Sequence, residues 1–188
     1  MQAAMTPITT PTTARWTRDD YYRLLDAGIL TGRRVQLLDG EIIEMPAMKA
    51  PHARALIAAR TVLLTRRPDG GELAQQTPTS LGLASDPEPD AMIYRLDDRH
   101  PVTGHPSQPL WVMEISDTTL RFDLGVKLRI YARAGIAAYW VLDLNGRVLH
   151  VHAEPTGGRY AHHQVYQPGD VVALPWPASP VSVADLLA

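Results

Sequence analysis

The chain has 188 residues, of which 45% are hydrophobic, 20 are acidic and 18 are basic, and its formal net charge is −2. This length and hydrophobic content fit one domain with a full core, and the lack of an apolar run near twenty residues argues against a membrane span. The balanced charge excludes a global basic field for nucleic acid, and the lack of cysteine excludes disulfides, thiolate metal sites and cysteine nucleophiles.

The first residues of the chain predict no folded structure. Residues 1–14 are rich in Thr and Pro and lack the charged-then-apolar pattern of a signal peptide. We therefore expect a disordered N-terminal lead over residues 1–14, a single domain over residues 15–188, and a cytoplasmic protein.

The beginning of the folded part predicts a helix, a hairpin and a second helix. Trp16 to Ile29 is expected to be helical, because Thr17 is a suitable N-cap and acidic residues follow it. The Asp39-Gly40 dipeptide favours a tight turn, so residues 35–43 predict a β-hairpin. Residues 53–66 have high helix propensity and end before a Pro-Asp-Gly-Gly segment.

The remainder predicts mostly strands. Short apolar runs between Pro- or Gly-bearing segments predict strands over residues 73–76, 80–83, 90–94, 110–116, 147–153 and 160–166. A polar loop is expected over residues 96–109, and a short terminal element over residues 181–187. A helix over residues 123–134, closed by Gly135, precedes a strand over residues 138–142, and this order implies a parallel strand pair.

Three charged residues form the main candidate site. Asp90 and Glu114 lie on predicted strands that otherwise look buried, and Lys127 lies on the helix that follows. Buried charges are costly to desolvate, so a negative pair near a cation suggests a site for a divalent metal and a polarised water. Such a set suits hydrolysis of a phosphodiester, whereas the structural alternative is a buried ion pair that only helps to define the packing.

The sequence around these residues resembles a known family. Pro89-Asp90, Val112-Met-Glu114-Ile-Ser116 and the run from Asp123 to Asp143 are similar to the Uma-two family of restriction endonucleases, within the PD-(D/E)XK nuclease superfamily. The similarity extends from about Trp16 to the C-terminus. It implies an α/β fold with a restriction-endonuclease-like core of order α-β-β-β-α-β, a mixed central sheet, an N-terminal helix and hairpin, and extra C-terminal strands.

The resemblance also implies roles for the three charged residues. Asp90 and Glu114 match the two carboxylates that bind Mg²⁺ or Mn²⁺, and Lys127 matches the catalytic lysine. In the superfamily pattern this lysine lies two residues after the second carboxylate, where this chain has Ser116. Lys127 matches a position on the helix to which the lysine has moved.

Further candidates follow from the resemblance or from local patterns. Glu41 resembles the family's additional acidic residue, which could be a third metal ligand or could position a water molecule. The alternative is that Glu41 is an exposed glutamate of the hairpin. His52 matches a histidine at the start of the family's helix and is a candidate acid or base. The alternative is that His52 lies at the start of the helix without any such role. Asp123 is expected to cap the helix that carries Lys127, and this role is favoured over metal binding. We interpret the histidines at 150, 152, 162 and 163 as surface strand residues rather than a metal site.

The resulting functional prediction is a Mg-dependent endodeoxyribonuclease that hydrolyses DNA. Because cutting a duplex needs two active sites or two visits, a homodimer is expected. The alternative is a nuclease-fold protein without turnover that acts as a nucleic-acid-binding or assembly module.

Overall fold

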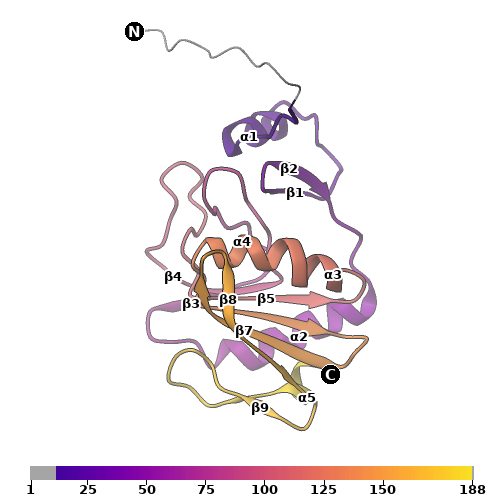
Figure 1. Ribbon diagram of the computed structural model, residues 1–188, viewed down its shortest axis with the longest axis vertical. Coiled ribbons are helices and arrows are strands. Elements are labelled where there is room, and N and C mark those ends of the chain that lie inside the picture. The colour runs from indigo at the N-terminus through magenta and orange to yellow at the C-terminus, as the bar shows by residue number, and fades with distance from the viewer. Residues whose placement is uncertain (1–11, 188) are drawn as a thin grey trace.

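The computed structural model describes residues 12–187 (Figure 1). The predicted disordered lead falls largely on residues 1–11, outside this range, and residues 12–14 belong to no helix or strand. The assignment of residues 15–188 to a single domain stays a prediction. No helix in the described part of the chain is long and apolar enough to cross a membrane.

Helices flank a sheet of six strands. In chain order the elements are α1 (Arg18–Asp26), β1 (Val35–Leu38), β2 (Glu41–Glu44), α2 (Ala50–Leu64), β3 (Gly71–Ala74), β4 (Ala91–Arg95), β5 (Trp111–Ser116), α3 (Leu120–Phe122), the π-helix η1 (Asp123–Lys127), α4 (Leu128–Arg133), β6 (Ala138–Asp143), β7 (Val148–Thr156), β8 (Arg159–Tyr166), β9 (Val171–Val172), β10 (Val181–Ser182) and α5 (Val183–Leu186). The sheet has the order β3-β4-β5-β6-β7-β8. β5 and β6 are parallel, as predicted, and the other neighbouring pairs in this sheet are antiparallel.

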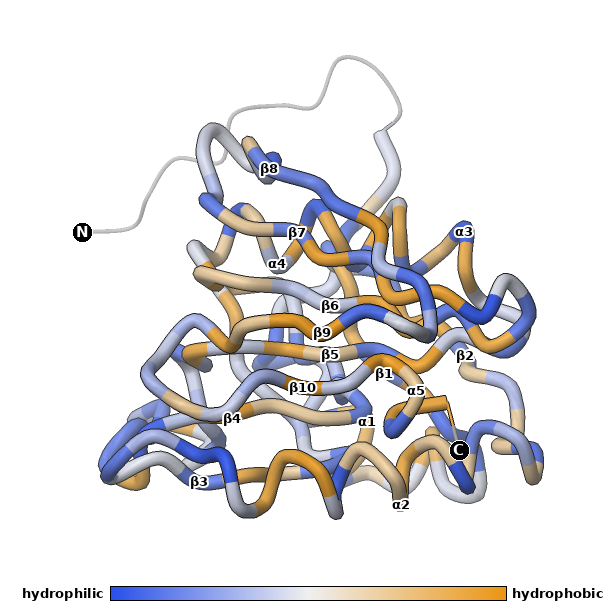
Figure 2. The backbone as a smooth tube through the Cα atoms, turned by 90° about the horizontal axis from the view of Figure 1, so that it is seen from below, coloured by the Kyte–Doolittle hydropathy of each residue, from blue (hydrophilic) through white to orange (hydrophobic). Residues whose placement is uncertain are grey.

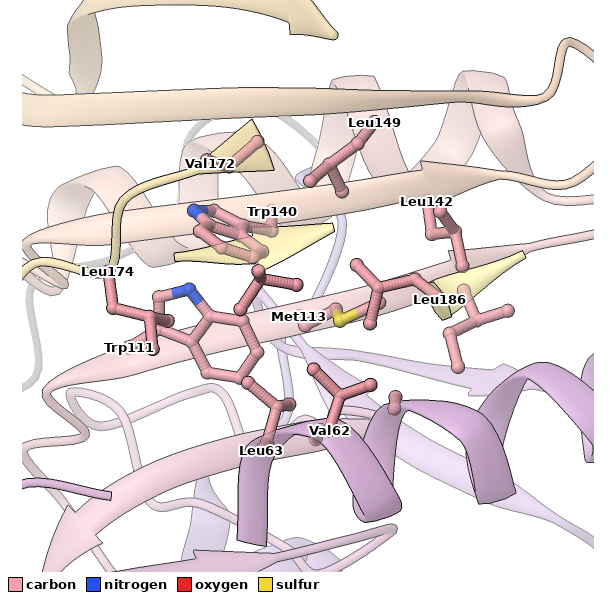
Figure 3. Close-up of a cluster of buried hydrophobic side chains, with 14 of the residues drawn as sticks. Val62, Leu63, Trp111, Met113, Trp140, Leu142, Leu149, Val172, Leu174 and Leu186 are labelled. Atoms are coloured by element: carbon pink, nitrogen blue, oxygen red, sulfur yellow. The ribbon is translucent and has the colours of Figure 1, made fainter. Parts of the chain in front are cut away.

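The two faces of this sheet pack against different elements. α2 covers one face, and α4 lies on the opposite face together with α1 and the β1–β2 hairpin (Figure 1). Alternation along β5 directs Trp111 and Met113 toward α2, where Trp111 meets Trp140 edge-to-face with ring centroids 5.2 Å apart (Figure 3). Val112 faces the other way, against Tyr131 of α4. The order α2-β3-β4-β5-α-β6 is the predicted core.

The N-terminal elements form by the local signals expected of them. Thr17 and Asp20 make a capping box at the start of α1, and Asp39 and Gly40 turn the hairpin with φ values of 51° and 75°. α1 is shorter than the predicted helix because the chain turns after Asp26, and Gly28 has a positive φ of 73°.

One strand prediction was wrong, and one short strand was missed. Residues 80–83 form no strand, because the chain turns at Gly82, with φ of 59°, and only an isolated bridge joins Leu81 to Ser85. β9, which pairs with β10, was not predicted. Its two residues are too few to give a periodic pattern.

The prediction that Asp123 caps a helix was also wrong. The helix begins at Leu120 with Thr119 in the capping position, so Asp123 lies inside it, at the start of the π-turn. Its carboxylate accepts hydrogen bonds from the hydroxyls of Ser116 and Thr119, both at 2.6 Å, instead of from free helix N–H groups.

Candidate active site

Asp90 lies where β4 begins and β5 ends. Because the two strands are antiparallel, with Ala91 opposite Met113, Asp90 comes to lie beside the last residues of β5. The Ile115 N–H donates to its Oδ2 at 2.8 Å, and the ring of His52, from the first turn of α2, contacts its Oδ1 at 2.9 Å. Asp90 is buried, so these contacts fix its orientation.

Glu114 lies two residues before the end of β5 and is only 2% exposed. Its Oε2 is 2.9 Å from the Nζ of Lys127, and its Oε1 accepts a hydrogen bond from the Tyr131 hydroxyl at 2.7 Å. Both partners come from the helix between β5 and β6. That helix therefore supplies a positive charge and a neutral donor to the same carboxylate.

A π-turn carries Lys127 into the site together with Asp123. The turn spans Asp123 to Lys127, and the Oδ1 of Asp123 lies 4.0 Å from the Lys127 amine. Single π-turns inside helices occur frequently at functional sites. Ser116, the position to which the resemblance assigned the lysine of the superfamily pattern, donates to Asp123. Sequence reasoning favoured a helix cap over metal binding for Asp123 and so left it out of the site, although its position four residues before Lys127 was a usable signal.

The electrostatics of the site are dominated by burial and by an excess of carboxylates. Burial raises the pKa of Glu114 to about 8, although the charge of Lys127 opposes this, and it also raises the pKa of Asp123. Burial alone would raise the pKa of Asp90, but His52 and Lys127 hold it below its ordinary value. Burial alone would lower the pKa of Lys127, but the three carboxylates raise it.

A small cavity of about 50 Å³ opens onto these groups. Besides Asp90, Glu114, Asp123, Lys127 and His52, its polar and charged lining includes Arg34, Gln36, Lys49 and Glu88. Lys49 and Lys127 are the chain's two lysines, and both therefore line the cavity. Sequence reasoning missed Gln36 and Glu88. The available signals were a polar residue in the apolar run 35–38 and an acidic residue two positions before Asp90.

The structure does not bring Glu41 to this cavity. Its side chain is 54% exposed on β2, where it forms an ion pair with Arg15, and it does not belong to the cavity lining. The histidines of β7 and β8 also lie elsewhere, with Nδ1 of His150 3.2 Å from Nε2 of His163. Within residues 12–187, no three His, Cys, Asp or Glu side chains are arranged to hold a metal ion by themselves.

A mixed sheet with helices on both faces, and with a buried carboxylate pair and a lysine at its centre, defines a restriction-endonuclease-like fold. A crystal structure of a "putative nuclease belonging to DUF820" from Anabaena variabilis ATCC 29413 has the same fold, with a TM-score of 0.64 and 19% sequence identity over 91% of this chain and 97% of that chain. The Uma2 family model, described as "Putative restriction endonuclease", matches residues 18–179. The chain belongs to this family, which confirms the resemblance found in the sequence. No curated protein matches the chain.

Proposed function

We propose that this protein is a metal-dependent endonuclease that hydrolyses phosphodiester bonds of DNA. The observation that carries the proposal is the cavity itself, where Glu114 and Asp123 contact the buried ammonium of Lys127 and Asp90 contributes a third carboxylate to the lining. A buried cluster with more carboxylates than cations is costly without further positive charge. A divalent cation bound in the cavity would supply that positive charge.

The donor set suits a hard cation. Asp90 and Glu114 offer carboxylate oxygens, and each of these oxygens has one donor, which leaves it able to accept a further contact. Oxygen ligands are those that Mg²⁺ and Mn²⁺ prefer. When bound at Asp90 and Glu114, the cation would supply Lewis acidity toward the phosphate and lower the pKa of a water molecule.

The chain's own side chains have separate tasks in this proposal. Lys127, held by Glu114 and Asp123, offers positive charge and a hydrogen bond to the phosphate as negative charge builds on it. Lys49 is exposed and lies at the N-terminus of α2, so it is placed to contact a phosphate of the DNA backbone. His52 orients Asp90 through their 2.9 Å contact. A direct acid or base role for His52 and any role for Glu41 stay predictions.

The alternative is a nuclease-fold module that binds nucleic acid or another protein without turnover. One contact favours it, because the Lys127 amine already neutralises Glu114 at 2.9 Å without any metal. The net charge of −2 also provides no global attraction to DNA.

Cleavage of supercoiled plasmid with Mg²⁺ or Mn²⁺ tests the two proposals. Asp90→Asn, Glu114→Gln and Lys127→Met should each lower the cleavage rate by about 100-fold or more, because each removes a charge that acts on the reacting phosphate. Asp143→Asn is the matched control. Asp143 is also a buried carboxylate at the end of a strand of the same sheet, but it accepts from Asn145 and Gly146 N–H groups and does not line the cavity.

The outcomes separate the proposals. Equal cleavage by all variants would show that the assigned residues are not the active site. A wild-type protein that binds DNA but never cuts it with either metal would support the binding module. The same assay with RNA of matching sequence tests the preference for DNA. A homodimer, to be measured by sedimentation, and a cytoplasmic location complete the proposal.

A further inference from the structure

Gln36 is a buried polar residue that the mechanism above does not use. It belongs to β1 and is 2% exposed, and within residues 12–187 its Oε1 has no hydrogen-bond partner. We propose that Gln36 supplies a neutral oxygen ligand to the cation held by Asp90 and Glu114. This inference rests on the proposed function, because it concerns the metal site of the same cavity.

The strand geometry directs Gln36 toward the cavity. Side chains alternate along β1, and Val35 and Leu37 pack against α1, whereas Leu38 packs against the opposite side, with the sheet and α4. Gln36 shares the side of Leu38 and lines the cavity together with Asp90 and Glu114. A carboxamide with an unpartnered oxygen is thus placed among the proposed metal ligands.

The energetics of burial indicate that this oxygen meets a ligand. An unpartnered buried carboxamide oxygen destabilises a fold, and an apolar side chain of similar size would avoid this cost. The neighbours of Gln36 along β1 are all apolar, so the strand itself does not need an amide. The amide is explained if the cavity holds a group that contacts its oxygen.

A cation is the group that best matches this oxygen. Mg²⁺ takes about six oxygen ligands, and amide oxygens are accepted alongside carboxylates. Because Asp90, Glu114 and Asp123 already contribute three carboxylates to the cavity, a neutral ligand adds an oxygen without adding to the excess of negative charge.

Mn²⁺ binding to the DNA-free protein, followed by the paramagnetic resonance signal of free Mn²⁺, tests the proposal. Gln36→Met removes the oxygen at nearly constant size. It should raise the Kd for Mn²⁺ about tenfold, which is the size of the affinity loss when other groups that support a metal site are removed. Gln36→Glu should lower the Kd, because it replaces a neutral oxygen by a charged one. Urea unfolding in EDTA should show Gln36→Met to be at least as stable as the wild type.

Gln76 provides the matched control. Its amide nitrogen is also buried without a partner among the described residues, but Gln76 does not line the cavity. Gln76→Met should therefore leave Mn²⁺ binding unchanged.

Each outcome has a defined meaning. Unchanged Mn²⁺ binding by Gln36→Met, or a clear loss of stability of this variant in EDTA, would overturn the ligand role and leave the proposed function intact. Weaker binding by Gln36→Met in a protein that never cuts DNA would support the ligand and count against the endonuclease. A wild-type protein that binds no Mn²⁺ would overturn both metal assignments.

Discussion

At the scale of single residues, Glu114 shows how a buried charge is accommodated. One of its oxygens lies 2.9 Å from the Lys127 amine, and the other accepts the Tyr131 hydroxyl at 2.7 Å. Tyr131 also packs in the apolar cluster between the sheet and α4. A buried carboxylate is destabilising unless its oxygens are satisfied, so this tyrosine has an electrostatic task as well as a packing one.

Removal of the Tyr131 hydroxyl should therefore be costly. At pH 9, above the pKa of Glu114, we expect Tyr131→Phe to lower the free energy of unfolding by about 2 kcal/mol, because a hydrogen bond to the ionised Glu114 carboxylate is lost. Urea unfolding in EDTA measures this loss. Tyr139→Phe is the control, since the Tyr139 hydroxyl donates to the neutral backbone oxygen of Asp123 at 3.1 Å and its loss should cost about 1 kcal/mol. Equal losses in the two variants would mean that Tyr131 does not support the charge of Glu114.

The residues of the site were predictable to different degrees. Asp90, Glu114 and Lys127 stood out because a charge in an apolar run is rare, and the structure brings them to one cavity. Gln36 gave a weaker signal, because an isolated glutamine in a short strand is equally compatible with a buried position and with an exposed sheet edge. Glu41 was misleading, because the hairpin turn directs it to solvent.

At the scale of elements, the helix between β5 and β6 combines a regular and an irregular part. Its π-turn contains Gly125, where an added Cβ would meet no atom within 4 Å and where φ is not positive. Neither close packing nor backbone strain therefore requires glycine at this position. Glycine there only increases the conformational freedom of the unfolded chain.

Substitution of this glycine should stabilise the protein. Gly125→Ala is expected to raise the free energy of unfolding by about 0.5–1 kcal/mol, measured by urea unfolding. Gly135→Ala, at the end of α4, should instead be destabilising by about 1 kcal/mol. There is equal space around Gly135, but its φ of +75° is unfavourable for alanine. If both variants are destabilised, the π-turn depends on glycine for a reason other than space or φ.

The elements themselves were mostly predictable, and their ends were not. The Asp39-Gly40 turn and the Thr17 cap are local signals, and both predictions were confirmed. The start of the helix at Leu120 was not predicted, because Thr119 bonds to the Asp123 side chain and not to the helix backbone. The same Asp123 carboxylate also accepts from Ser116 at the end of β5, so the start of the helix depends on a contact with the preceding strand.

At the scale of the whole molecule, the outer strands of the sheet protect one histidine. Figure 2 shows β8 as largely hydrophilic, in agreement with its exposed side chains. His152 of β7 is nevertheless only 6% exposed, since it stacks against His163 of β8 and lies against Tyr139. Burial, together with the neighbouring His163 and His150, lowers the pKa of His152 to about 4.

The contribution of His152 to the stability of the protein should therefore fall in mildly acidic solution. The unfolded chain protonates this imidazole below about pH 6.5, whereas the folded state does so only near pH 4, so protons favour unfolding between these values. From pH 7.5 to pH 5, His152 should cost on the order of 2 kcal/mol. Urea unfolding at the two pH values should show that His152→Phe gains stability relative to the wild type by about this amount when the pH is lowered.

An exposed histidine of the same sheet is the control for this effect. His162 pairs with Glu154 at the surface, and His162→Gln should keep the pH dependence of the wild type. A pH dependence of His152→Phe equal to that of the wild type would show that another group is responsible.

The overall arrangement could be predicted only in part. The order of the core elements and the parallel pair β5–β6 followed from the sequence and are confirmed. The position of α1 and the hairpin did not follow, because it depends on long-range contacts such as the buried ion pair between Arg18 and Asp86, 68 residues apart. No local pattern specifies such a pairing.

The distances along the chain between the site residues have a consequence for protein synthesis. Asp90 contacts His52, 38 residues before it, whereas Glu114 depends on Lys127 and on Tyr131, 17 residues after it. A growing chain that ends before these last two residues lacks the charge and the donor that allow Glu114 to be buried. On the proposed function, an unfinished chain therefore has no active site, and a cell is exposed to cleavage only by chains that have been synthesised past the helix.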